Sequence, residues 1–70
     1  MKTEEQLREK ARYFYKRSMQ LFDQDDMDRS RQFESRGDLL LSFVLEYSPD
    51  QKEKVWNEAV KDYKKAKEGK

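Results

Sequence analysis

An acidic stretch at residues 23–28 is the first candidate for metal chemistry in this chain. It reads Asp-Gln-Asp-Asp-Met-Asp, and Glu34 stands twelfth when Asp23 is counted as the first position. A calcium-binding loop ends on such a glutamate, but it also needs an oxygen ligand where Met27 stands and a glycine at its sixth position. We therefore interpret these aspartates as turn and helix-cap residues, and we expect neither a metal site nor a cofactor.

The composition of the chain offers few residue types that commonly catalyse reactions. The chain contains no histidine and no cysteine, so it offers neither an imidazole base nor a thiolate nucleophile. Carboxylates are numerous, yet no pair stands in an apolar setting that would separate the pKa values of its two members. We expect no catalytic residues and a protein that is not an enzyme.

A basic and aromatic segment between residues 8 and 17 is the one candidate for nucleic-acid binding. Cations at its ends and centre could neutralise phosphates, while the interleaved tyrosines could stack on bases of a single strand. Glu5 and Glu9 on the same helix and a net charge of only +1 argue against this interpretation. A solvated helix face is favoured. The alternative nucleic-acid face consists of Arg12, Lys16 and Arg17, together with the lysines of the last helix.

The segment Leu39–Tyr47 is the only densely apolar part of the chain, and it defines what the other elements must cover. Plotted on a helix at about 100° per residue, its apolar arc spans roughly 240°, which is wider than the stripe of an ordinary surface helix. We therefore expect this helix to be covered on more than one side. The central stripe is Phe33, Gly37, Leu40, Val44 and Tyr47; one flank is Leu39 and Phe43, and the other is Leu41 and Leu45.

Capping residues predict three helices, at about residues 3–22, 26–47 and 49–67. Thr3 with Gln6, and Ser48 with Gln51, have the spacing of capping boxes, in which each side chain satisfies the backbone amide of the other residue. Pro49 favours the first position of a helix and disfavours helical backbone in the residue before it. The second helix is expected to start at Asp25 or Asp26 as its cap.

Two alternatives to these boundaries remain open from the sequence. Since no glycine or proline interrupts residues 23–28, one continuous helix from Thr3 to Tyr47 is possible. Gly37 could also end a short helix, or it could let a neighbouring helix approach closely. We favour a second helix that continues through Gly37, because an isolated helical glycine costs only about 1 kcal/mol.

The charges of the three segments favour an antiparallel arrangement. Residues 1–22 carry +3 (six basic, three acidic), residues 23–50 carry −5 (three basic, eight acidic), and residues 51–70 carry +3 (seven basic, four acidic). An acidic middle helix therefore lies between two basic ones. The predicted fold is all-α, a small up-down-up three-helix bundle that forms a single domain over residues 1–70.

A 70-residue chain without disulfides or metal commonly needs oligomerisation or closely packed helices for stability. Two neighbours in a three-helix bundle can cover the central stripe of the second helix, but they need not cover both of its flanks. We therefore expect a non-enzymatic protein-interaction module that forms a homodimer through the second helix. No run of residues approaches a membrane span or a signal peptide, so a cytoplasmic protein is expected. The candidate interface residues are Leu39, Leu41, Phe43, Leu45 and the outward-facing Tyr13.

Overall fold

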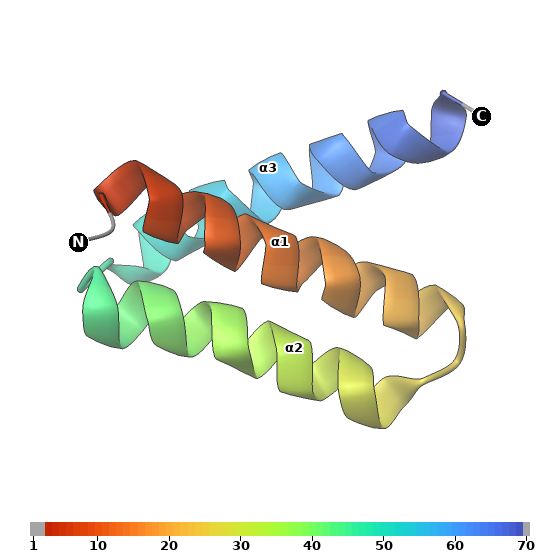
Figure 1. The fold of residues 1–70 in the computed structure, drawn as a ribbon, viewed down its shortest axis with the longest axis horizontal. Coiled ribbons are helices and arrows are strands. Elements are labelled where there is room, and N and C mark those ends of the chain that lie inside the picture. The colour runs from red at the N-terminus through yellow and green to blue at the C-terminus, as the bar shows by residue number, and fades with distance from the viewer. Residues whose placement is uncertain (1–2, 70) are drawn as a thin grey trace.

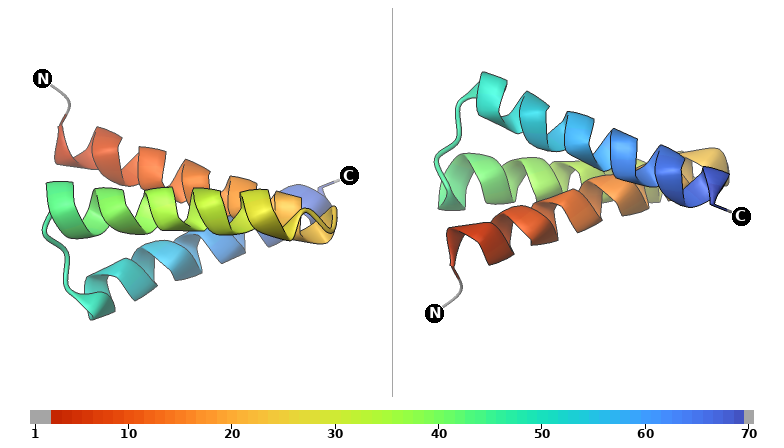
Figure 2. Two further views of the ribbon diagram at one scale, coloured as in Figure 1. Left: turned by 90° about the horizontal axis from the view of Figure 1, so that it is seen from below. Right: turned by 90° about the horizontal axis from the view of Figure 1, so that it is seen from above.

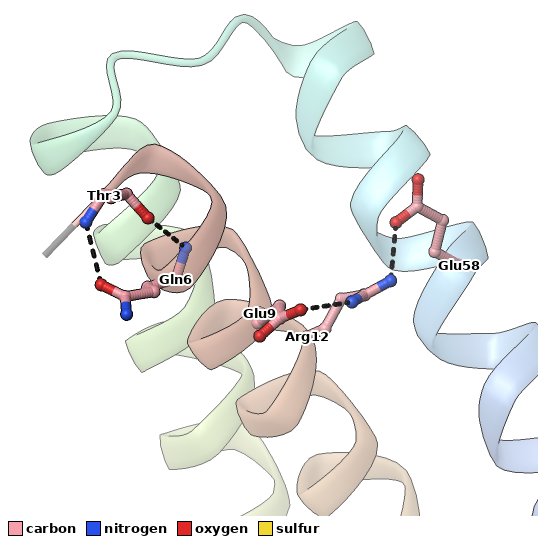
Figure 3. A network of polar contacts seen from close by, with 5 residues as sticks. All are labelled: Thr3, Gln6, Glu9, Arg12 and Glu58. Atoms are coloured by element: carbon pink, nitrogen blue, oxygen red, sulfur yellow. Dashed lines mark hydrogen bonds and ion pairs between the residues drawn. The ribbon is translucent and has the colours of Figure 1, made fainter.

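The computed structural model describes residues 3–69 and consists of three helices, as the sequence predicts. The first, α1 (Glu4–Asp23), begins at Thr3, whose Oγ1 accepts from the Gln6 amide at 3.2 Å while the Gln6 side chain accepts from the Thr3 amide at 3.0 Å. Figure 3 shows this reciprocal pair at the start of the helix. The predicted capping box is confirmed.

A tight reversal at Asp25 separates α1 from α2 (Met27–Leu39), so the continuous-helix alternative is wrong. Asp25 has a left-handed backbone with φ 61°, and the next amide, that of Asp26, donates to the Leu21 carbonyl at 2.9 Å. Aspartate tolerates this conformation better than most residues. The Asp26 side chain then accepts from the Arg29 amide and caps α2, as expected.

The end of the second helix differs from the prediction, because the helix stops short of Tyr47. After α2 the chain continues as a short π-helix, η1 (Leu40–Val44), in which the Leu45 amide donates to the Leu40 carbonyl five residues back. Glu46 then adopts a left-handed φ of 55° and turns the chain away. The wider π turn and this residue end the helix before Pro49 can do so.

The third helix, α3 (Pro49–Glu68), starts at the predicted position. Ser48 Oγ accepts from the Gln51 amide at 3.3 Å, the Gln51 side chain returns the interaction at 2.9 Å, and Pro49 occupies the first helical position. This capping box allows the chain to re-enter a helix only three residues after the left-handed Glu46.

The three helices run up, down and up, which confirms the predicted bundle (Figure 1). Helices α1 and α2 lie side by side along their lengths, whereas α3 crosses α1 and its C-terminal half diverges from α2 (Figures 1 and 2). The core is small, and its centre consists of Ala11, Tyr15, Leu41, Val55 and Ala59.

Small residues bring α1 and α2 close together. Ala11 and Ser18 on α1 are buried against Ser30 and Gly37 on α2. A Cβ placed on Gly37 would lie 3.0 Å from the ring of Tyr15 and 3.2 Å from the Ala11 carbonyl oxygen. Gly37 therefore sits inside an unbroken α2, and its role is to allow the close approach of α1.

No helix in residues 3–69 combines the length and apolar character that crossing a membrane requires.

Candidate interaction surfaces

The end of the second helix exposes three large apolar side chains, which we call the η1 patch: Leu39, Phe43 and Val44. Their exposed fractions are 52%, 76% and 57%. A π-helix has more residues per turn than an α-helix. The residues four and five positions after Leu39, which are Phe43 and Val44, therefore both lie about one turn further along the helix. The π geometry therefore places Phe43 and Val44 on the same face as Leu39.

The opposite flank of this helix belongs to the core of the monomer. Leu41 is completely buried, and Leu45 is half-buried against the same cluster. Of the candidate interface residues, Leu39 and Phe43 therefore lie at the surface, while Leu41 and Leu45 pack inside. Val44, which the sequence places on the covered central stripe, is exposed instead, because the π turn rotates it out of the core.

Backbone and side-chain bonds hold the segment after η1 against α1. The Tyr47 amide donates to the Leu41 carbonyl at 2.9 Å, and the Tyr47 hydroxyl donates to Glu4 Oε1 at 2.8 Å. Arg8 also donates to that hydroxyl, at 3.4 Å. The bond to Glu4 raises the pKa of Tyr47. These contacts fix the path of the chain on which the η1 patch stands.

The predicted nucleic-acid residues separate into two groups. Lys16 and Arg17 border a cleft of about 370 Å³ between α1 and α3, together with the exposed Tyr13 and with Tyr63 and Lys67 of α3. The fold therefore brings basic residues of α1 and α3 together, which is the arrangement that the alternative hypothesis of a nucleic-acid face requires. Tyr63 is not among the residues predicted from the sequence, although its position close to Lys61, Lys64 and Lys65 was a usable signal.

Arg12 does not join this cleft. It pairs with Glu58 on α3 at 3.2 Å and with Glu9 on its own helix at 3.8 Å (Figure 3). Asp23 also counters the positive charge of the cleft, because it accepts from Lys67 at 3.1 Å and from the Tyr63 hydroxyl. The bonds from Tyr63 and Lys67 lower the pKa of Asp23, and Asp23 raises the pKa of Tyr63.

A groove lies between α2 and α3. It consists of two cavities of about 560 and 430 Å³ that share Glu34 and Trp56. The groove has a polar half near the start of α3 and an apolar half toward its end. Trp56 is half-buried: it packs against the core and also borders both cavities of this groove.

The floor of the groove carries a buried phenol. Tyr15 packs edge-on against Trp56, with 5.0 Å between ring centroids and 74° between ring planes. Burial, and then the nearby carboxylates of Asp38 and Glu34, raise the pKa of Tyr15 to about 12. Three carboxylates, Glu34, Asp38 and Glu53, and two cations, Arg31 and Lys52, border this polar half.

Residues 3–69 contain no group of three acidic side chains close enough together to bind a metal ion.

Comparison with known proteins found no matching family model, no matching curated protein and no matching solved structure.

Proposed function

We propose that this protein is a protein-interaction module that self-associates through the η1 patch. The observation that carries the proposal is the exposure of Leu39, the last residue of α2, and of Phe43 and Val44 in η1, within six consecutive residues. Contiguous apolar side chains at a protein surface mark interaction sites more often than isolated ones do.

The backbone of this region supports the same proposal. π-Helices are rare and occur often at functional sites, and a non-glycine residue with positive φ, such as Glu46, costs free energy to maintain. A regular α-helix would not place Phe43 and Val44 on one face beneath Leu39. The exposure of the patch therefore depends on the π-helix and on the left-handed backbone of Glu46.

The size of the patch is suited to a weak, two-fold dimer. Full burial of a large apolar side chain contributes about 1.5–3 kcal/mol, and these three are about half exposed in the monomer. Six such side chains from two copies approach the cost of association, which is about 4–15 kcal/mol. A two-fold axis lets the patch pair with itself, and we expect a dimer at micromolar concentration.

Sedimentation equilibrium of the wild type and of Phe43→Lys tests this function. We expect the wild type to dimerise and Phe43→Lys to be a folded monomer with an unchanged helical circular-dichroism spectrum. Phe22→Lys is the matched control, because Phe22 is also an exposed phenylalanine, at 57% against 76% for Phe43, and lies at the opposite end of the bundle. Leu41→Lys should unfold the chain. A wild type that stays monomeric up to millimolar concentration would refute self-association.

A second candidate function is binding of single-stranded nucleic acid in the cleft between α1 and α3. The observation in its favour is the meeting of Tyr13, Lys16 and Arg17 with Tyr63 and Lys67. It ranks second because Arg12 is held by Glu58, Asp23 neutralises Lys67, and the net charge is only +1.

Fluorescence anisotropy with a labelled single-stranded oligonucleotide at physiological salt ranks the two functions. We expect binding no tighter than nonspecific association, about 10⁻⁴–10⁻⁶ M. Submicromolar binding that is lost in the double variant Lys16→Glu, Arg17→Glu would place nucleic-acid binding first. Arg29→Glu, an exposed change on α2 outside the cleft, controls for the loss of positive charge alone.

A further inference from the structure

The groove between α2 and α3 is left open because the two helices diverge. Its apolar half is bordered by Met19 and Phe22 of α1 and by Trp56, Val60 and Tyr63 of α3. Figure 1 shows α3 leaving the α1–α2 pair toward its C-terminus, and the apolar cavity of about 430 Å³ lies among residues of all three helices. The floor consists of the α1 face that a fully packed α3 would have covered.

The charges of the groove are unbalanced. Its two cavities are bordered by four carboxylates and two cations; Asp23 is paired with Lys67 outside the groove and Asp38 with Lys52, which leaves one negative charge in excess. Lys52 is already paired with Asp38 at 3.0 Å, so it does not neutralise the other acids of the polar half. Glu34 and Glu53, on opposite walls, therefore share that half with Arg31. The four carboxylates are Asp23, Glu34, Asp38 and Glu53, and the two cations are Arg31 and Lys52.

We propose that this groove binds an amphipathic helix of a partner protein, with apolar side chains in the Phe22–Val60 half and lysine or arginine at Glu34 and Glu53. Two helices that diverge over a third leave the place that a fourth helix occupies in a four-helix bundle. A docked helix presents side chains at i, i+3, i+4 and i+7, so a single face can reach both halves.

The groove and the η1 patch share no residue, so this second site is independent of self-association. Its apolar half accepts two or three large side chains against Met19 and Trp56, and its polar half sets the direction of the partner helix. A partner helix with glutamates in place of the cations would meet Glu34 and Glu53 as like charges, and binding of that helix is disfavoured.

A display library of 20-residue helices, randomised on one face and selected against the full chain, tests the proposal. We expect enriched sequences with two or three apolar residues at one end of the face and lysine or arginine at the other. Their binding is followed by the fluorescence of Trp56, the only tryptophan in the chain. The double variant Glu34→Lys, Glu53→Lys should weaken binding at least tenfold, and it should bind better when the peptide's cations are replaced by glutamate.

Three controls make the result decisive. Phe22→Ser should weaken the selected helices about tenfold, whereas Glu68→Lys, an exposed carboxylate outside the groove, should not. Phe43→Lys should bind them as the wild type does, so that a failure of self-association is distinguished from a failure of the groove. The proposal is overturned if no helix is enriched, or if the enriched helices bind the Glu34→Lys, Glu53→Lys variant equally well. It is also overturned if the groove variants abolish dimerisation, which would make a second copy the occupant.

Discussion

The α1–α2 interface and the α2–α3 groove are adjacent regions that are packed differently, since Ser18 and Ser30 of the interface also border the apolar cavity of the groove. On the α1 side, small residues let the backbones approach until a single added methyl at Gly37 would touch the Ala11 carbonyl. On the α3 side, Trp56 borders the groove and Lys52 pairs with Asp38 across it at 3.0 Å. The closed interface is therefore formed by small residues, whereas larger side chains border the open groove.

Stability and binding are divided between these two regions. The side chains of the closed interface are buried and tightly packed, so substitutions there should lower the free energy of unfolding substantially. Most residues bordering the groove are exposed or half-buried, and substitutions of the exposed ones should cost little stability while they change what the groove can bind. The four predictions below test this division, from the largest expected effect to the smallest.

The largest effect is expected for Gly37→Leu in the closed interface. The new side chain would overlap the Tyr15 ring and the Ala11 carbonyl, and the second of these is backbone that moves only with α1. We expect a loss of about 3 kcal/mol in the free energy of unfolding by urea titration. Ser35→Leu, two residues away and bordering the groove, is the matched control and should change stability by less than about 0.5 kcal/mol. Equal losses in both variants would remove the distinction between the two regions.

Tyr15 belongs to both regions, and its titration links them. The unfolded phenol has a pKa near 10, and the folded one has a pKa of about 12, so between these values the folded state keeps a proton that the unfolded state has lost. The contribution of Tyr15 to the free energy of unfolding is therefore fully present below pH 10 and is lost as the pH rises to 12. Two pKa units correspond to at most about 2.7 kcal/mol, and water in the groove reduces this amount.

The Tyr15→Phe variant isolates that contribution. Urea titrations at pH 8, 10 and 11.5 should show a smaller loss of stability with pH in the variant than in the wild type. Tyr13→Phe, which removes the hydroxyl of an exposed tyrosine on the same helix, is the matched control. An unchanged slope in Tyr15→Phe would mean that solvent reaches the Tyr15 phenol freely in the folded state.

A smaller effect is expected from the buried serine pair in the closed interface. Ser30 Oγ donates to the Ser18 carbonyl at 2.9 Å and lies 3.2 Å from Ser18 Oγ. Ser30→Ala should destabilise by about 1 kcal/mol, since it removes both interactions and leaves Ser18 Oγ buried without this partner. Thermal unfolding followed by circular dichroism measures the change. Ser35→Ala, on the groove side, should be neutral or slightly stabilising, and a loss there as large as in Ser30→Ala would contradict the comparison.

The smallest effect is expected for the ion pair that bridges the groove. Lys52 and Asp38 are partly exposed, so the pair should contribute no more than about 0.5 kcal/mol. A double-mutant cycle with Lys52→Gln and Asp38→Asn measures their coupling in low and high salt. A coupling above about 1.5 kcal/mol would mean that this pair, and not residue size, fixes the distance between α2 and α3.

The sequence alone determined where the helices begin and how they follow one another. Thr3 with Gln6, Ser48 with Gln51, and Asp26 act on amides three residues away, so their effect depends only on local chain geometry. The balance of charge along the chain and the apolar pattern were likewise sufficient for the up-down-up bundle. The function and the partner of this fold remain proposals.

Only the tertiary structure decided which apolar flank of the second helix is exposed. On a regular helical wheel Leu41 and Phe43 are equivalent flank residues, yet one is completely buried and the other is 76% exposed. The π turn at Leu40–Val44 and the left-handed Glu46 rotate this end of the helix, and no residue type announces them. The divergence of α3 from α2 could not be predicted from the sequence either. Nor could the pairing of Arg12 with Glu58, which joins side chains 46 residues apart. Such contacts arise when whole helices compete for the same space, and local patterns do not record that competition.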